Sequence, residues 1–246
     1  MADRSAYANT ILKVIKVFDG VSRDKLLGSV LIVIKTLHDG NTESVSVMAS
    51  SLANVAATDY VASKLTLNRI EAVINHAESN ITFGPSHGIH METRMQNKGV
   101  GTFIFNELVT YLQRHAANYN VNTFEFSGDD DFSNEQQERT IAFLNKFNVH
   151  MKFNDGEQHV GFARSQPPQQ MESYINPAKV QEIDIEKYIF ELVSERNSYE
   201  SELKQLRDDL SRKTDETFAG IPKSELIKYT LIACGVSVIF VLFMVI

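Results

Sequence analysis

The sequence predicts a mixed α/β (α+β) domain that is followed by a helical coiled-coil stalk and one transmembrane helix. Three observations favour this class: alternating apolar runs between turn residues, a heptad repeat beyond them, and an uncharged apolar end. Hydrophobic residues make up 43% of the 246 residues, which is typical of a folded chain. The expected parts are a domain (1–164), a linker (165–182), a stalk (183–219), a juxtamembrane segment (220–229) and a membrane helix (230–246).

The first eighty residues contain three expected strands. Val and Ile are frequent in the segments Thr10–Phe18 and Leu27–Leu37, and a shorter strand is expected at Ser44–Met48. Turn signals follow the first two strands, at Asp19-Gly20 and at Asp39-Gly40-Asn41. Residues 50–80 are ambiguous, although Leu67, Ile70, Val73 and Ile74 fit one face of a helix.

In the second half of the domain, the sequence pattern predicts the order strand, loop, helix, strand, helix, strand, turn, strand. A strand is expected to end at Ile89–Glu92, and a helical stripe runs from Val100 to His115. Val121–Phe126 is the next expected strand. Ser133 and Gln136 form a capping box for a helix that carries Ile141, Leu144 and Phe147. Alternation then predicts two strands, around Met151 and Val160, joined by the turn Asn154-Asp155-Gly156.

The loop before the long helix carries the clearest functional signal. Glycines at positions 99 and 101 allow the backbone to approach a ligand closely, and free amides of a first helical turn favour an anion. A tight turn without a ligand is the alternative interpretation. The loop is not a dinucleotide fingerprint, because the third glycine is missing, and it is not a P-loop, because no Gly-Lys-Ser/Thr follows.

The element order and this loop resemble the GNAT family of acyl-CoA-dependent N-acyltransferases. Gln96-Asn-Lys-Gly99-Val-Gly101 matches the family signature Gln/Arg-x-x-Gly-x-Gly/Ala, and residues 142–149 resemble a second family block. The resemblance implies a mostly antiparallel sheet with flanking helices and acetyl-CoA as the co-substrate. It also implies that the CoA pyrophosphate is held by seven residues: Gln96, Asn97, Lys98, Gly99, Val100, Gly101 and Thr102.

The resemblance places a catalytic base at Glu92, and the alternative is a solvent-exposed carboxylate on an edge strand. Two residues depart from the family pattern: Leu144 stands where a tyrosine often protonates the leaving thiolate, and Asn148 stands where glycine is usual. His87 and His90 lack a third ligand, so we expect no metal site. The run Asp129-Asp130-Asp131 either attracts a cationic substrate or forms a solvated loop.

The carboxyl-terminal end predicts a membrane anchor. Residues 230–246 contain no charge and would span roughly 25 Å as a helix, although a buried core segment would show the same composition. Lys223 and Lys228 precede the apolar run, so the main domain is expected to face the cytoplasm as a single-pass, tail-anchored protein. The single cysteine, Cys234, lies in this end and excludes an intrachain disulfide.

A heptad repeat precedes the anchor. Eight residues recur at alternating spacings of four and three, which predicts a homo-oligomeric coiled coil over residues 185–210: Ile185, Ile189, Leu192, Arg196, Tyr199, Leu203, Leu206 and Leu210. The alternative is one amphipathic helix packed on its own domain. The net charge of −7 argues against nucleic acid as a partner.

Two functions are compatible with these features. The first is a membrane-anchored N-acetyltransferase that transfers an acetyl group from acetyl-CoA to an amine. The second is a catalytically inactive GNAT-like module that acts as an oligomeric membrane scaffold. The identity of the amine is open, because protein lysine, an amino sugar, a polyamine and a small drug all fit.

Overall fold

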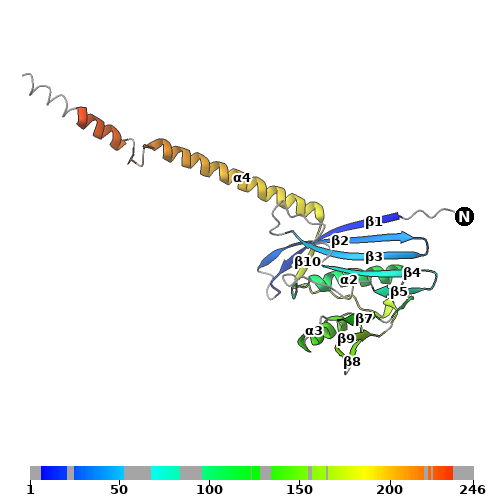
Figure 1. Cartoon of the computed structure of the whole chain (residues 1–246). Coiled ribbons are helices and arrows are strands. Elements are labelled where there is room, and N and C mark those ends of the chain that lie inside the picture. Colours follow the sequence, from blue (N-terminus) through cyan, green and yellow to red (C-terminus); the bar gives the residue numbers. More distant parts are fainter. Residues whose placement is uncertain are drawn as a thin grey trace, which may run out of the picture. The chain divides into compact units, whose positions relative to one another are not determined.

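The computed structural model describes residues 7–20, 25–52, 68–83, 96–122, 124–127, 134–154, 157–164, 166–218, 221–222 and 224–234. They belong to two compact units, residues 1–187 and residues 188–246. The first unit is mixed α+β and contains both of its sheets, whereas the second consists mainly of helix (Figure 1).

A mostly antiparallel sheet of seven strands forms the larger part of the first unit. Its order is β10-β1-β2-β3-β4-β5-β6, and only β5 and β6 pair in parallel. The strands are β1 (Tyr7–Phe18), β2 (Leu26–Asp39), β3 (Thr42–Ser51), β4 (Arg69–Asn75), β5 (Asn80–Phe83), β6 (Asn120–Val121) and β10 (Val180–Ile183). The three strands expected in residues 10–48 are therefore confirmed, each extended by a few residues.

Helix α2 (Val100–His115) covers one face of this sheet and packs on β3 and β4 (Figure 1). His115 of the expected stripe is exposed and Tyr111 is half-buried. The stripe is confirmed at Val100, Ile104, Leu108 and Leu112, which are buried. These side chains join Ile15, Ile32, Val45, Val47 and Ile74 from the strands in one core. Full burial of one such side chain contributes about 1.5–3 kcal/mol.

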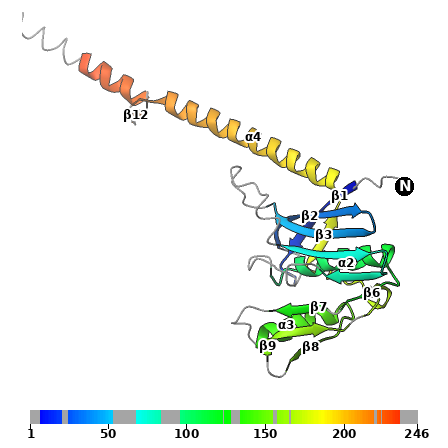
Figure 2. The same cartoon turned by 45° about the vertical axis from the view of Figure 1, so that its right-hand side comes forward.

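A second, three-stranded sheet follows α2 and β6 in the chain. Its order is β7-β9-β8, from β7 (Phe124–Ser127), β8 (Met151–Asn154) and β9 (Glu157–Ala163), and α3 (Asn134–Asn145) packs on β8 (Figure 2). Phe105 of α2 lies 4.5 Å from Phe147 and 5.4 Å from Phe143, measured between ring centroids. This aromatic contact connects α3 and the turn after it to α2.

One expectation differs from the structure. Residues 121–126 do not form one strand, because β6 ends at Val121 in the large sheet and β7 begins at Phe124 in the small one. The segment 69–75, which was ambiguous, is strand β4, with Ile70, Ala72 and Ile74 on its buried face and Val73 on the other. The strand expected at 89–92 and the capping residue Ser133 lie outside the described residues.

The segment expected to be a linker contributes to the first unit. Pro168 of the short helix η2 (Pro168–Gln170) and Met171 after it are buried, and β10 pairs antiparallel with β1 at the edge of the sheet. The two prolines therefore interrupt regular secondary structure but do not separate this segment from the core. It stays attached because the apolar side chains of Met171 and Val180 are buried there.

The second unit contains most of α4 (Ile185–Glu216), the short strands β11 (Thr217–Phe218) and β12 (Ile221–Pro222), and a helix over residues 224–234. The stalk was expected to begin at residue 183, and its helix begins at Ile185 in the structure. Within the described residues, no helix has the length and hydropathy that crossing a bilayer requires. Residues 235–246, most of the expected anchor, lie outside them.

Candidate functional site

The amino-terminal end of α2 lies against the start of β10. Gly99, the residue before α2, closely approaches Lys179 and Val180, and β10 is the edge strand opposite to β6 in the seven-stranded sheet. The chain runs from β5 through α2 to β6, and β5 and β6 are parallel, with Asn80 opposite Asn120 and Ile81 opposite Val121.

Residues 96–99 form a turn that leads directly into α2. Asn97 has φ of 59° and Gly99, the residue that precedes α2, has φ of 83°. The Phe103 amide donates to the Gly99 carbonyl at 3.0 Å, which is the first bond of the helix. The amides of Val100, Gly101 and Thr102 have no acceptor within α2, since the first turn of a helix never supplies one.

Lys179, just before β10, packs against this turn. A Cβ added at Gly99 would lie 3.0 Å from Lys179 Cβ and 3.2 Å from Val180 Cγ1, and one added at Gly20 would lie 2.8 Å from Lys179 Cγ. The Lys179 stem therefore passes between two glycines, and its Nζ donates to the Asn97 carbonyl at 2.6 Å. Gly99 is required by this close approach as well as by its positive φ.

The electrostatic character of the turn is positive. The amino-terminal end of α2 carries the positive end of the helix dipole, its first turn has no acidic residue, and Lys179 adds an ammonium group. The Lys179 ammonium is hydrogen-bonded to the Asn97 carbonyl, and its stem fills the space beside Gly99. The groups left without an intrahelical acceptor are the first-turn amides of α2, which are chemically suited to an anion such as a phosphate.

The seven residues expected to hold the pyrophosphate lie together in one turn of chain. Gln96 and Asn97 are exposed, Lys98, Gly99 and Gly101 are half-buried, and Val100 and Thr102 are buried. The backbone amides of the buried pair can still face a ligand, because an amide points along the helix axis and the side chain points away from it. The expected catalytic base, Glu92, lies outside the described residues, as do His87, His90 and Asp129–Asp131.

The structure also places the two residues that depart from the family pattern. Leu144 is fully buried in the core. Asn148 has φ of 58°, a conformation that asparagine tolerates better than most residues, and its side-chain amide donates to the Gln170 carbonyl at 2.9 Å. Asn148 therefore adopts the left-handed conformation for which glycine is usual at such a turn.

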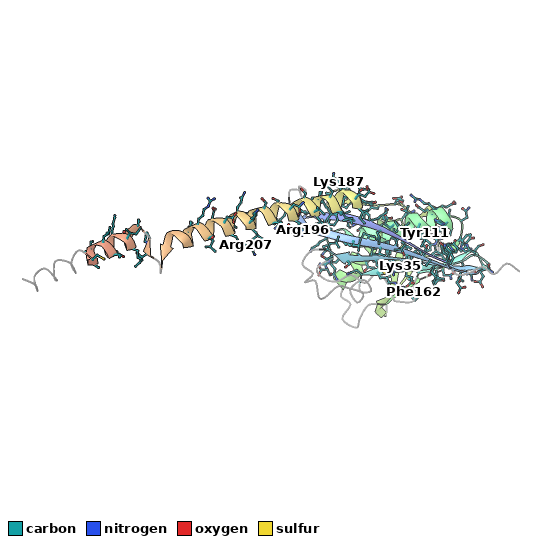
Figure 3. The ribbon with its side chains drawn as sticks, turned by 90° about the horizontal axis from the view of Figure 1, so that it is seen from above. Lys35, Tyr111, Phe162, Lys187, Arg196 and Arg207 are labelled. Carbon is teal, nitrogen blue, oxygen red and sulfur yellow. The ribbon has the colours of Figure 1, made fainter. Side chains whose placement is uncertain are left out.

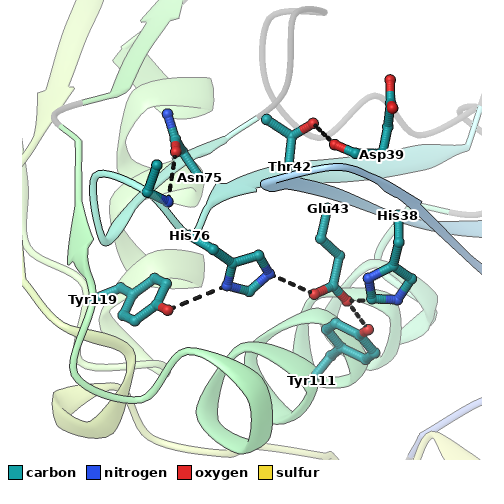
Figure 4. Close-up of polar contacts among 9 residues, drawn as sticks. His38, Asp39, Thr42, Glu43, Asn75, His76, Tyr111 and Tyr119 are labelled. Carbon is teal, nitrogen blue, oxygen red and sulfur yellow. Dashed lines mark hydrogen bonds and ion pairs between the residues drawn. The ribbon is translucent and has the colours of Figure 1, made fainter. Parts of the chain in front are cut away.

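A second polar cluster lies at the opposite end of α2, around Glu43 of β3 (Figure 4). The side chain of Glu43 is only 2% exposed. Its carboxylate accepts a hydrogen bond from the Tyr111 hydroxyl of α2 and one from His76 Nε2 at 3.1 Å, and His38 Nε2 lies 3.4 Å away. Glu43 thus joins α2 to strand β2 and to the turn between β4 and β5.

Each polar atom at the centre of this cluster has an internal partner. If His76 donates through Nε2 to Glu43, its Nδ1 accepts from the Tyr119 hydroxyl, 3.2 Å away (Figure 4). The rings of His38 and Tyr7 stack at 4.2 Å, as do those of His115 and Tyr111. Because the donors and acceptors satisfy one another, the cluster acts as a polar cross-link, and no group of three ligands suited to a metal occurs among the described residues.

The surroundings of Tyr111 raise the pKa of its phenol. Burial raises the pKa of the Tyr111 phenol above its usual value, and its hydrogen bond to Glu43 raises it further, against a smaller opposite effect of Thr36. Ionising Tyr111 would place two negative charges side by side in a buried position. The protonated phenol is therefore part of what holds α2 to the sheet.

Sequence reasoning missed Glu43 and Lys179. A signal for Glu43 was present, because the odd-numbered positions Val45 and Val47 of the same strand face the core and place Glu43 on that face. For Lys179 no local pattern exists, since its contacts are with residues about 80 and 160 positions away.

Comparisons with protein-family models, with curated proteins and with solved structures find no match.

We predict that Gly99→Ala destabilises the first unit more than Gly40→Ala does. Both glycines have positive φ, which costs an alanine about 1–2 kcal/mol, but an added Cβ meets Lys179 only at Gly99. The expected losses in the free energy of unfolding are about 1 kcal/mol for Gly40→Ala and about 2–3 kcal/mol for Gly99→Ala. Urea denaturation measures both, and equal losses would show that Lys179 does not crowd the turn.

We also predict that Tyr111→Phe lowers the free energy of unfolding by about 1–3 kcal/mol at neutral pH, because Glu43 loses a buried donor. Since the folded pKa of Tyr111 is raised, its contribution is complete below pH 10.0, the ordinary pKa, and is lost above it. The stability difference between wild type and variant should therefore shrink above that pH. Thermal unfolding across this range, with Tyr119→Phe as the matched control, measures it; a constant difference would contradict the assignment.

Proposed function

We propose that this protein is an acyl-CoA-dependent N-acyltransferase, most simply an N-acetyltransferase, tethered to a membrane by its carboxyl-terminal end. The observation that carries the proposal is the glycine turn before α2, with the Lys179 ammonium beside it. The observed order α2, β7, α3, β8, β9 agrees with the later part of the element order that led to the resemblance. The strand expected at Ile89–Glu92 lies outside the described residues.

In this function, the amides of Val100, Gly101 and Thr102 bind the pyrophosphate of acetyl-CoA. The chemical step needs a base that removes a proton from the attacking ammonium, and Glu92 is the proposed base. The acetyl carbon then forms a bond with the amine nitrogen and breaks its bond with sulfur, which leaves as the CoA thiol. The buried Leu144 supplies no proton, so solvent or another donor protonates the thiolate.

The proposed tether rests on exposed apolar side chains before the carboxyl terminus. In the helix over residues 224–234, Ile227, Leu231 and Ile232 are 60–68% exposed. Tyr229 is 62% exposed and suits a membrane–water interface. We propose that this helix continues into the apolar run up to residue 246 and that the main domain faces the cytoplasm.

A second candidate function is an oligomeric membrane scaffold without catalysis. A specific observation favours it: apolar heptad residues of α4 are exposed, with Leu203 57% and Leu206 58% exposed. Contiguous exposed apolar side chains mark an interaction site in soluble segments. Acetyl transfer that is lost in Glu92→Gln, while CoA binding persists, would exclude this candidate.

We predict that the full chain in detergent binds CoA and that Gly101→Glu weakens this binding at least about tenfold, or 1.4 kcal/mol. A carboxylate in the first turn suits the helix dipole, so α2 stays folded, but it occupies the amides and repels the pyrophosphate. Lys179→Met, which keeps the apolar stem, should weaken binding too. Isothermal titration calorimetry measures all three proteins.

The matched control is Ser201→Glu, which makes the same charge change on the exposed surface of α4 and should leave CoA binding unchanged. Absence of CoA binding by the wild-type chain would refute the acyltransferase proposal and leave the scaffold. Equal weakening in both glutamate variants would show that net charge, rather than the turn, governs binding.

We predict that the full chain sediments as a dimer or larger oligomer and that Leu203→Glu combined with Leu206→Glu returns it to a monomer. The two glutamates place charge in the apolar seam, where it would lose its hydration on association. The control pair is Ser201→Glu with Gln205→Glu, on the other side of α4, which should leave the oligomer intact. Analytical ultracentrifugation gives the result, and a monomeric wild type would refute self-association.

A further inference from the structure

Apolar residues of α4 recur at the heptad spacing of a coiled coil. Ile189, Leu192, Tyr199, Leu203 and Leu206 occupy seam positions and are each 46–64% exposed. Phe190 and Val193 are exposed beside this seam and widen the apolar surface near the start of the helix. A seam of alternating four- and three-residue steps is the pattern against which a second helix packs. The occupant that matches this repeat is a second copy of α4.

One charged residue interrupts the seam and decides how two copies can align. Arg196 lies on α4 at a seam position (Figure 3). Its guanidinium contacts Glu200 of the same helix at 2.7 Å. In a parallel, in-register pair, Arg196 would lie opposite Arg196 of the second copy. Two guanidinium groups would then share one layer of the interface, which is unfavourable even with Glu200 nearby.

In an antiparallel pair the two arginines no longer face each other. The seam residues named above still pack against seam residues of the second copy. When Leu192 lies opposite Leu203 of the second copy, Ile189 lies opposite Leu206, and Arg196 lies opposite Tyr199. An arginine over a tyrosine ring is a favourable contact, and the two-fold symmetry forms each pair twice. The layers therefore pair apolar with apolar and cation with aromatic ring.

The charges that flank the seam do not separate the two orientations. In the parallel pair, Glu202 faces Arg207 but Glu195 faces Glu200. In the antiparallel pair, Glu186 faces Arg207 but Glu195 faces Glu202. Each orientation thus has one attractive and one repulsive type of pair, worth a few tenths of a kcal/mol in exposed positions. The residues within the seam therefore decide the orientation.

We infer that two copies of this protein associate through an antiparallel coiled coil of α4, with Arg196 of each copy against Tyr199 of the other. The inference deepens the self-association on which the scaffold candidate rests, and it is independent of CoA binding. It specifies the partner, the direction and the register of the interface.

Cysteine cross-linking of the full chain in detergent tests this orientation. In a Cys234→Ser background, Leu192→Cys and Leu203→Cys are prepared separately, each with a different size tag, and are oxidised alone and as a mixture. The expected result is a disulfide-linked heterodimer in the mixture and little cross-linking of either variant alone, because each position then lies roughly 16 Å along the axis from its own counterpart.

The control pair is Ser194→Cys with Ser201→Cys, which lie at the same height in the antiparallel pair but face away from the seam, so no cross-link is expected. Cross-links within each single variant, with few in the mixture, would establish a parallel pair and overturn the orientation while self-association stands. A wild-type chain that is monomeric by ultracentrifugation would overturn both.

Discussion

Helix α2 is fixed against the seven-stranded sheet at both of its ends, and the geometry of the candidate site depends on this. At the amino-terminal end, Gly99 allows the stem of Lys179 to pack on the turn, and the Lys179 ammonium holds the Asn97 carbonyl. At the other end, the Tyr111 hydroxyl donates to the buried carboxylate of Glu43. Between these points, the apolar stripe of α2 packs on β3 and β4. A helix held in three places keeps its first-turn amides in a fixed direction, as an anion site requires.

The two ends of α2 differ in chemistry. At the Glu43 end, the Glu43 carboxylate, the Tyr111 hydroxyl and the His76 ring are hydrogen-bonded within the protein, so the cluster stabilises the fold. At the Gly99 end, the amides of the first turn have no intrahelical acceptor, and the nearby lysine adds positive charge. Function is therefore proposed at the amino-terminal end. Gly99 alone would not justify it, because the contact with Lys179 already requires a glycine there.

Local patterns predicted the elements of the fold and missed some long-range contacts. Alternation and turn residues identified β1, β2 and β3, and the 3.6-residue stripe identified α2, because each depends on neighbours in sequence. The 69–75 segment was ambiguous since Ile70 and Ile74 fit both a strand and a helix. The prolines at 167 and 168 indicated a linker, yet Val180 returns the chain to the edge of the sheet. The role expected for the seven residues 96–102 stays a prediction, whereas the contact of Lys179 with this turn was found only in the structure.

The binding of CoA at the start of α2 is decided by a crystal structure of the full chain with CoA. We expect electron density for the pyrophosphate within hydrogen-bond distance of the amides of Val100, Gly101 and Thr102, beside the Lys179 ammonium. The group next to the sulfur would then identify the base and the site of the amine. Density for CoA at any other place, or an α2 turn without density at saturating CoA, would refute binding at this turn.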